Sequence, residues 1–264
     1  MNASALVLWM VGFPDRALGR ASDAIALSKR LNHPSSIAYA LFHTGLLHIW
    51  RREPELAQGC AQAVLDIAEE HEYQIWNAVG SCVRGAALAA MGTAEEGLVL
   101  TQRAIKTYRE LKTPPIFLPM LLSLHAGTYG LAGRPEDGLR ALDEAVEIAA
   151  RGPMKTMSSE FFQLRGDLLL VQSWDKRAPS GTRAPSGTAE AESWFQKAVD
   201  VAAEVQAPMP GLRAALRLSR LWCEQGKTEP AHKLLSEAYN KFTEGFATAD
   251  LREAKALLDD LSRG

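Results

Sequence analysis

Small residues recur along this chain at a fixed interval, inside segments whose larger apolar residues follow a helical spacing. Two series share a basic spacing of 40 or 41 residues, and each contains one longer step of 53. The first series is Ala5, Gly45, Gly85, Ala126, Gly166 and Ser219, and the second is Ala17, Ala57, Gly97, Gly138, Ala191 and Ala231. A period of this length with two small positions predicts a repeated pair of helices.

Turn signals separate the two small positions of a repeat. Segments such as Gly12–Asp15, Gly133–Glu136 and Gly226–Glu229 place a glycine before a proline or an acidic residue. Glycine suits the left-handed position after a helix, and proline or an acidic side chain suits the first turn of the next helix. Prolines also mark most breaks between repeats, but the break near His71 has neither proline nor glycine.

The small residues predict where two antiparallel helices cross closely, because a larger side chain would separate the backbones. One such pair cannot bury its own apolar face, whereas stacked pairs can. We therefore predict an all-α fold, a right-handed α-solenoid of about six helix pairs that forms one domain over residues 1–264. A capping-box-like start at Asp250 and leucines at helical spacing predict a C-terminal capping helix over residues 250–262.

The longer step coincides with a tandem repeat. The sequence RAPSGT occurs at residues 177–182 and again at 183–188. Its proline, glycine and serine content is typical of a surface loop. We predict a flexible insertion over residues 174–188 that is tolerated by the fold, and a functional loop is the alternative.

The N-terminal stretch Ala5–Phe13 is apolar, but no basic residue precedes it, which argues against a signal peptide. It is interpreted as the shortened first helix of the first repeat. An uncovered end of a solenoid exposes core-like surface. We therefore expect a docking end for upstream repeats or for self-association, formed by Leu6, Leu8, Trp9 and Val11.

Charge and composition argue against several classes of function. With 29 basic and 31 acidic residues the formal net charge is −2, which argues against a dedicated binder of nucleic acid or of an anionic membrane. No apolar run approaches the length of a membrane span. The three cysteines, Cys60, Cys82 and Cys223, form no paired motif, so a reducing cytoplasmic setting is expected.

No catalytic, metal-binding or cofactor-binding constellation emerges. Gly226-Lys227-Thr228 resembles the end of a phosphate-binding loop, but Leu221 stands where the motif needs its first glycine. His43 and His48 are five residues apart and so lie on diverging helix faces. Glu160 and Asp167 are one heptad apart on one helix, which indicates a solvated or ligand-facing surface rather than a catalytic pair. We predict a chain that is not an enzyme and carries no metal or cofactor.

The helix–turn–helix repeat with small residues 12 apart resembles the tetratricopeptide (TPR) family, in extended and degenerate copies. Several stretches also resemble the C-terminal TPR region of bacterial signalling proteins. In those proteins a class III adenylate/guanylate cyclase or a DNA-binding domain precedes an AAA-type ATPase. The stretches are Leu41–Ala57, Ser158–Leu170, Ala189–Ala202, Leu218–Leu235 and Lys241–Leu261.

The resemblance implies a groove lined by the first helix of each pair. The candidate groove contacts are Tyr39, Phe42, Leu46, Glu160, Gln163, Asp167, Arg213 and Arg220. They form an apolar end and a charged end, which would suit an extended or helical peptide. Equally, the apolar residues could pack against a neighbouring repeat. Chaperone-binding members of the family use Lys and Asn at such places, and this chain has neither there.

Two functional hypotheses follow from this reading. The first is a protein-interaction and regulatory module of a longer cyclase- or transcription-linked ATPase. The second is a free-standing peptide-binding adaptor. In both, the expected partner is a protein or peptide, or upstream domains of the same polypeptide.

Overall fold

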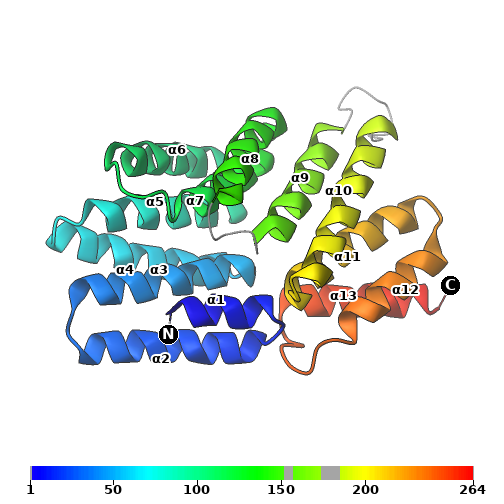
Figure 1. Ribbon diagram of the computed structural model, residues 1–264, viewed down its shortest axis with the longest axis horizontal. Coiled ribbons are helices and arrows are strands. Elements are labelled where there is room, and N and C mark those ends of the chain that lie inside the picture. The colour runs from blue at the N-terminus through cyan, green and yellow to red at the C-terminus, as the bar shows by residue number, and fades with distance from the viewer. Residues whose placement is uncertain (1, 152–156, 174–184, 264) are drawn as a thin grey trace. The chain divides into compact units, whose positions relative to one another are not determined.

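The chain folds into stacked pairs of antiparallel helices (Figure 1). The computed structural model describes residues 2–151, 157–173 and 185–263, and within these ranges it contains thirteen helices and no strand. The helices are α1 (Asn2–Met10), α2 (Pro14–Arg30), α3 (Pro34–Trp50), α4 (Pro54–Glu70), α5 (Gln74–Ala90), α6 (Ala94–Glu110), α7 (Leu118–Leu131), α8 (Pro135–Ala150), α9 (Ser158–Gln172), α10 (Pro185–Glu204), α11 (Pro208–Glu224), α12 (Thr228–Tyr239) and α13 (Ala249–Leu261). Six pairs and one final helix confirm the predicted all-α solenoid of helical repeats.

The helices belong to two compact units. The first contains Met1–Trp9 and Asp15–Ile148, and thus α1 to α8 almost entirely, whereas the second contains Met10–Pro14 and Ala149–Gly264. Within the first unit α3 contacts α5 and α5 contacts α7. Within the second, α9 contacts α11 and α11 contacts α13. We call the surface formed by these odd-numbered helices the first-helix face of each unit.

Most turns use a residue in the left-handed region of backbone conformation. Glycine takes this position where the sequence has it, for example at Gly92 and Gly226, with φ of 100° and 77°. Where glycine is missing, other residues adopt φ between 49° and 62°, namely Asn32, Arg52, Glu72, Lys112 and Gln206. This explains how the break near His71 forms without proline or glycine, at a cost in backbone strain.

The small residues lie at the predicted helix crossings. A Cβ atom added to Gly85 of α5 would come within 2.7 Å of the Gly97 carbonyl oxygen of α6. In the last pair serine takes the small position, and the Ser219 hydroxyl donates a hydrogen bond to the Ala231 carbonyl oxygen at 3.0 Å. The spacing of 12 residues therefore marks direct contact between the two helices of a pair.

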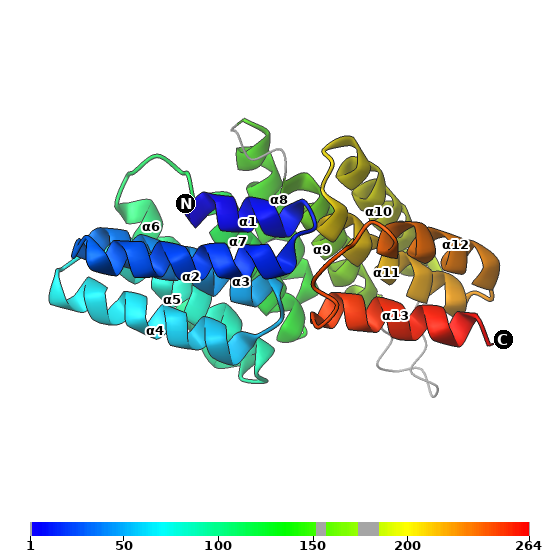
Figure 2. The same ribbon diagram turned by 90° about the horizontal axis from the view of Figure 1, so that it is seen from below.

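The tandem repeat and both ends of the chain complete the fold. Helix α10 begins at Pro185, within the second RAPSGT copy, and residues 174–184 of the expected insertion lie outside the described residues. Helix α13 buries Leu251, Ala254 and Leu258, and it packs on α11 and α12. At the other end, the two views show α1 beside α2 (Figures 1 and 2).

Candidate functional site

The first-helix face of the first unit is closed by packed rings. Phe42 of α3 lies between Trp76 of α5 and Phe117, with ring centroids 6.3 Å and 5.2 Å away. The Trp76 indole donates a hydrogen bond to the Ser35 hydroxyl at 3.0 Å. Tyr39 joins the same cluster, with its ring centroid 5.8 Å from that of Trp76. These contacts join α3, α5 and the start of α7.

This packing corrects the expectation of an apolar, accessible end of the groove. Phe42 and Leu46 are 1% and 0% exposed, so their side chains are not available to a peptide. Tyr39 is half-buried. The physical reason is that aromatic side chains at helical spacing are used to join neighbouring helix pairs, as the alternative interpretation of this segment held.

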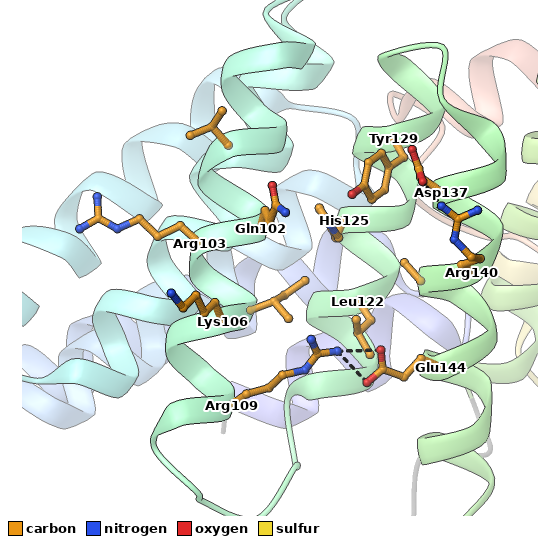
Figure 3. Close-up of a pocket in the computed structure, with 13 residues that line it drawn as sticks. Gln102, Arg103, Lys106, Arg109, Leu122, His125, Tyr129, Asp137, Arg140 and Glu144 are labelled. Carbon is orange, nitrogen blue, oxygen red and sulfur yellow. Dashed lines mark hydrogen bonds and ion pairs between the residues drawn. The ribbon is translucent and has the colours of Figure 1, made fainter.

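Helices α6, α7 and α8 of the same unit surround a cleft of about 550 Å³ (Figure 3). Residues from α6, α7 and α8 line it, and several are arginine or lysine. No sequence motif pointed to this cleft, because it depends on the packing of three helices.

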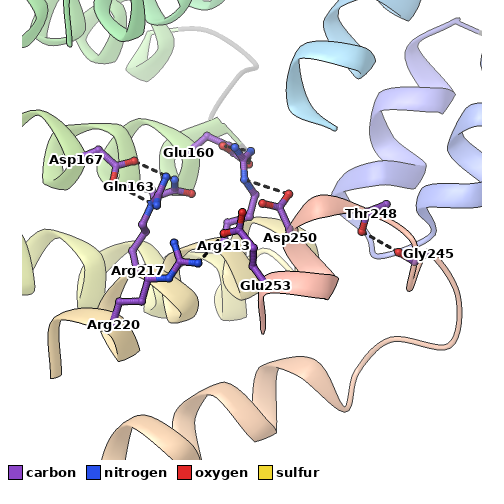
Figure 4. Close-up of polar contacts among 10 residues, drawn as sticks. All are labelled: Glu160, Gln163, Asp167, Arg213, Arg217, Arg220, Gly245, Thr248, Asp250 and Glu253. Carbon is purple, nitrogen blue, oxygen red and sulfur yellow. Dashed lines mark hydrogen bonds and ion pairs between the residues drawn. The ribbon is translucent and has the colours of Figure 1, made fainter. Parts of the chain in front are cut away.

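A larger polar arrangement lies on the first-helix face of the second unit (Figure 4). We call it the charged ladder. It consists of Glu160, Gln163 and Asp167 on α9, Arg213, Arg217 and Arg220 on α11, and Asp250 and Glu253 on α13. Spacings of three and four residues place each set on one side of its helix.

Arg213 occupies the centre of the ladder. Its Nη1 atom lies 3.0 Å from Glu160 Oε2 and 3.2 Å from Glu160 Oε1, and its Nε atom lies 3.6 Å from Asp250 Oδ2. The three side chains are 17%, 15% and 5% exposed. One guanidinium therefore joins all three helices through nearly buried carboxylates.

The electrostatics of this centre are strongly coupled. Burial raises the pKa of Glu160, the neighbouring charges of Asp250 and Asp167 raise it further, and Arg213 opposes them. Burial acts to lower the pKa of Arg213, but the three carboxylates outweigh it and raise that pKa above its usual range. Arg213 is therefore always charged, and it is the main reason that Glu160 can be ionised when buried.

The outer part of the ladder is more accessible. Arg217 Nε lies 3.0 Å from Asp167 Oδ1, and the Gln163 amide nitrogen donates to Asp167 Oδ2 at 3.2 Å. Arg220 Nη2 donates to Glu253 Oε2 at 2.7 Å. The side chains of Arg217 and Arg220 are 39% and 40% exposed. These two guanidinium groups are the charged atoms of the ladder that solvent reaches most easily.

A local turn sets the start of α13 and hence the place of its carboxylates. The Thr248 hydroxyl donates to the Gly245 carbonyl oxygen at 2.7 Å, and Gly245 has a φ of 80° (Figure 4). Thr248 is the residue before the helix, so the turn fixes where Asp250 enters the ladder.

Five of the predicted groove residues meet in the ladder, namely Glu160, Gln163, Asp167, Arg213 and Arg220. The prediction missed Arg217, Asp250 and Glu253. The spacing of Arg213, Arg217 and Arg220 along one helix was a signal for the first of these. Nothing in the sequence pattern indicated that the capping helix lies against the arginines of α11.

The predicted N-terminal docking residues differ in their exposure to solvent. Ala5 and Trp9 are 2% and 0% exposed, which corrects the expectation that Trp9 is available for docking. The two lie four residues apart and so share the inward side of the helix. Leu6 and Leu8 are half-buried, and Val11 is 37% exposed.

The remaining chemical candidates have structural roles. His43 Nδ1 lies 2.9 Å from the Tyr39 carbonyl oxygen, and His48 Nδ1 lies 2.7 Å from Glu53 Oε2, so the two histidines have separate partners. Gly226–Thr228 forms the turn before α12. Burial raises the pKa of all three cysteine thiols, which favours the unreactive form. Within the described ranges, no three His, Cys, Asp or Glu side chains are grouped to hold a metal.

Comparison with known proteins supports the fold. No family model matches the chain. An uncharacterized protein of Rhizobium meliloti, R02095, is 28% identical over 142 residues, which are 54% of this chain and 14% of the relative. The chain thus matches a small part of the length of that protein.

Two solved structures share the architecture at low sequence identity. The apo form of RapI superposes with a TM-score of 0.60 at 13% identity, over 98% of this chain and 82% of RapI. The apo form of the quorum sensor NprR from B. thuringiensis gives 0.58 at 12% identity, over 92% of this chain and 65% of NprR. The chain thus has a TPR-like helical-repeat fold. None of its described helices is long and apolar enough to cross a bilayer.

Proposed function

We propose that this chain is a protein-interaction module that contacts a peptide or protein segment through the charged ladder. The observation that carries the proposal is the ladder itself. It presents three guanidinium groups and four carboxylates on one face of three helices. Such a fixed pattern of opposite charges provides specificity and orientation more than raw affinity.

The internal ion pairs order the surface before a partner arrives. Arg213 is held by two nearly buried carboxylates, so it serves as the fixed centre. Arg217 and Arg220 retain solvent-exposed edges and can donate hydrogen bonds to a second carboxylate or to a carbonyl oxygen of a partner. Side chains that are already held in place lose less conformational entropy when a partner binds.

The comparisons support this proposal at the level of fold. NprR, whose architecture is similar, is a quorum sensor, and both similar structures are apo forms, so a ligand-responsive role fits the architecture. Fold alone does not specify function, and the site is therefore the main argument. We propose a non-enzymatic role in the cytoplasm with no cofactor.

A finer proposal concerns the context of the module. We propose that it acts as the C-terminal regulatory part of a cyclase- or transcription-linked ATPase. The resemblance of five stretches to such proteins supports this, and so does a relative about seven times as long as the segment that it shares with this chain. The alternative is a free-standing adaptor, which the match over most of RapI favours. The two alternatives are distinguished by the upstream coding sequence, because an open reading frame with cyclase or ATPase motifs there would favour the regulatory module.

The experiment selects peptides from a random phage-displayed library on the purified chain. The decisive variant exchanges an ion pair, Arg220→Glu with Glu253→Arg. This variant keeps the attraction between α11 and α13 but reverses the charge pattern. A matched control exchanges the exposed pair within α13, Lys255→Asp with Asp259→Lys.

We expect the selected peptides to bind the parent and the control, and to lose about tenfold or more in affinity for the ladder variant. If the peptides bind both exchanged variants as well as the parent, the ladder only stabilises the second unit, and the proposed site is wrong.

A further inference from the structure

The cleft between α6, α7 and α8 differs from the ladder in charge and in shape. Four basic residues and two carboxylates line it, in a chain whose overall charge is −2. The basic residues are Arg103, Lys106, Arg109 and Arg140, and the carboxylates are Asp137 and Glu144. The cleft is therefore a local region of positive charge.

Both carboxylates of the cleft are already engaged by arginines of the chain. Arg109 Nη2 donates to both carboxylate oxygens of Glu144, at 2.6 Å and 2.7 Å, and this pair spans the cleft (Figure 3). Asp137 accepts hydrogen bonds from Arg134, at 2.8 Å, and from Arg140. These pairs neutralise the acidic groups and leave the excess positive charge on α6.

Two cations of α6 carry that excess. Arg103 is exposed and makes no hydrogen bond or ion pair with any residue that the structure describes. Lys106 approaches Glu110 only to 3.9 Å, and the two side chains are 78% and 64% exposed. In the view of Figure 3 both side chains extend from α6 on the side away from α7 and α8. Their long, flexible stems allow the charged groups to reach a ligand at its edge.

The cleft also offers apolar contact. Ile105 and Leu122 are 4% and 2% exposed at its base, and Val99 is 66% exposed at its edge. His125 lies at the base, with Nδ1 2.7 Å from the Thr101 hydroxyl. Burial, together with the charges of Arg109 and Arg134, lowers the pKa of His125 to about 4, so the ring is neutral near pH 7. The base of the cleft is thus uncharged and partly apolar.

We propose that this cleft binds an acidic segment of a partner protein, which places an apolar side chain on Val99 and carboxylates beside Arg103 and Lys106. Charge complementarity and the mixed lining carry the inference. Nucleic acid fits less well, because tight binding needs many phosphate contacts and the cleft supplies few free cations. The inference is independent of the ladder.

The test measures binding of a short fluorescent peptide of alternating glutamate pairs and leucines, by anisotropy at low salt. The double variant Arg103→Glu with Lys106→Glu should weaken binding about tenfold or more. A control with the same change of charge, Arg20→Glu with Lys241→Glu, should bind within about twofold of the parent. Val99→Ser should weaken binding severalfold, because it removes the apolar contact without changing charge.

Three results would overturn the proposal. The first is equal binding by the parent and the Arg103/Lys106 variant. The second is equal binding of a peptide that has the same composition but all leucines at one end, which would show charge attraction alone. The third is displacement of the peptide by duplex DNA at a lower concentration than unlabelled peptide. The exchanged ladder variant should bind this peptide like the parent, so failure here is distinct from failure of the proposed function.

Discussion

Removing the guanidinium of Arg213 should destabilise the second unit more than any other single change in the ladder. In Arg213→Leu, Glu160 and Asp250 lose the cation that faces them while their side chains are 15% and 5% exposed. Breaking a buried ion pair typically costs about 3–5 kcal/mol. Because the Arg213 side chain is still 17% exposed, the expected loss is at the lower end of this range, about 3 kcal/mol.

The pH dependence identifies the cause of this loss. Glu160 has a pKa raised by burial, so its contribution to stability is present at low pH and is lost as pH rises through the folded-state pKa. Without Arg213 that pKa rises further, because the arginine is the main group that lowers it. The difference in unfolding free energy between parent and Arg213→Leu should therefore shrink as the pH falls from neutral toward the ordinary pKa of glutamate.

Urea unfolding followed by far-ultraviolet circular dichroism measures these differences, and hydrogen exchange of α9, α11 and α13 locates them. Adding Glu160→Gln to Arg213→Leu should recover part of the loss, since it removes one uncompensated charge. Arg220→Leu is the matched control, because that pair is 40% and 29% exposed and should contribute less than about 1 kcal/mol. An Arg213→Leu loss that is as small as the control, or that stays constant with pH, would refute the reasoning.

Three further outcomes follow from the fold. Gly85→Ala should lower the free energy of unfolding, measured by calorimetry, by about 1–3 kcal/mol, because its Cβ would clash with a backbone carbonyl oxygen of α6. The control Gly19→Ala meets nothing within 4 Å and should stabilise α2 slightly. Equal effects of the two changes would contradict the close crossing of α5 and α6. Glu72→Gly should raise stability by up to about 1 kcal/mol, because φ is 54° there, and a loss would show that the strain is absent. Folding lowers the pKa of His125 from 6.5 to about 4, so its contribution to stability should be lost as the pH falls through this range. The urea midpoint of the parent should therefore decrease over this range, and His125→Asn should make the decrease smaller. The same pH dependence in both proteins would contradict the lowered pKa.

The repeat architecture was predictable because its physical requirement is local. Small residues 12 apart report a close crossing of two helices, and Gly85 with Gly97 shows that contact directly. Turns that contain glycine or proline could also be predicted from the sequence. The turn at Glu72 was not, because a non-glycine residue in the left-handed region leaves no compositional signal.

The sites were predictable only in part, because they depend on which helices meet. Glu160 and Arg213 could be placed on the first-helix face from their repeat positions. Asp250 lies in the ladder because α13 packs on α11. The sequence pattern of the capping helix did not indicate this contact. Conversely, Phe42 was expected in a groove, but its ring is used to join α3 to its neighbours.

The most direct test of the proposed function is the dissociation constant of one selected peptide for the parent and for the Arg220→Glu, Glu253→Arg variant. The proposal predicts that the variant keeps the helical content and unfolding midpoint of the parent but binds the peptide about tenfold or more weakly. Equal dissociation constants for the two folded proteins would contradict the conclusion that the charged ladder recognises a partner.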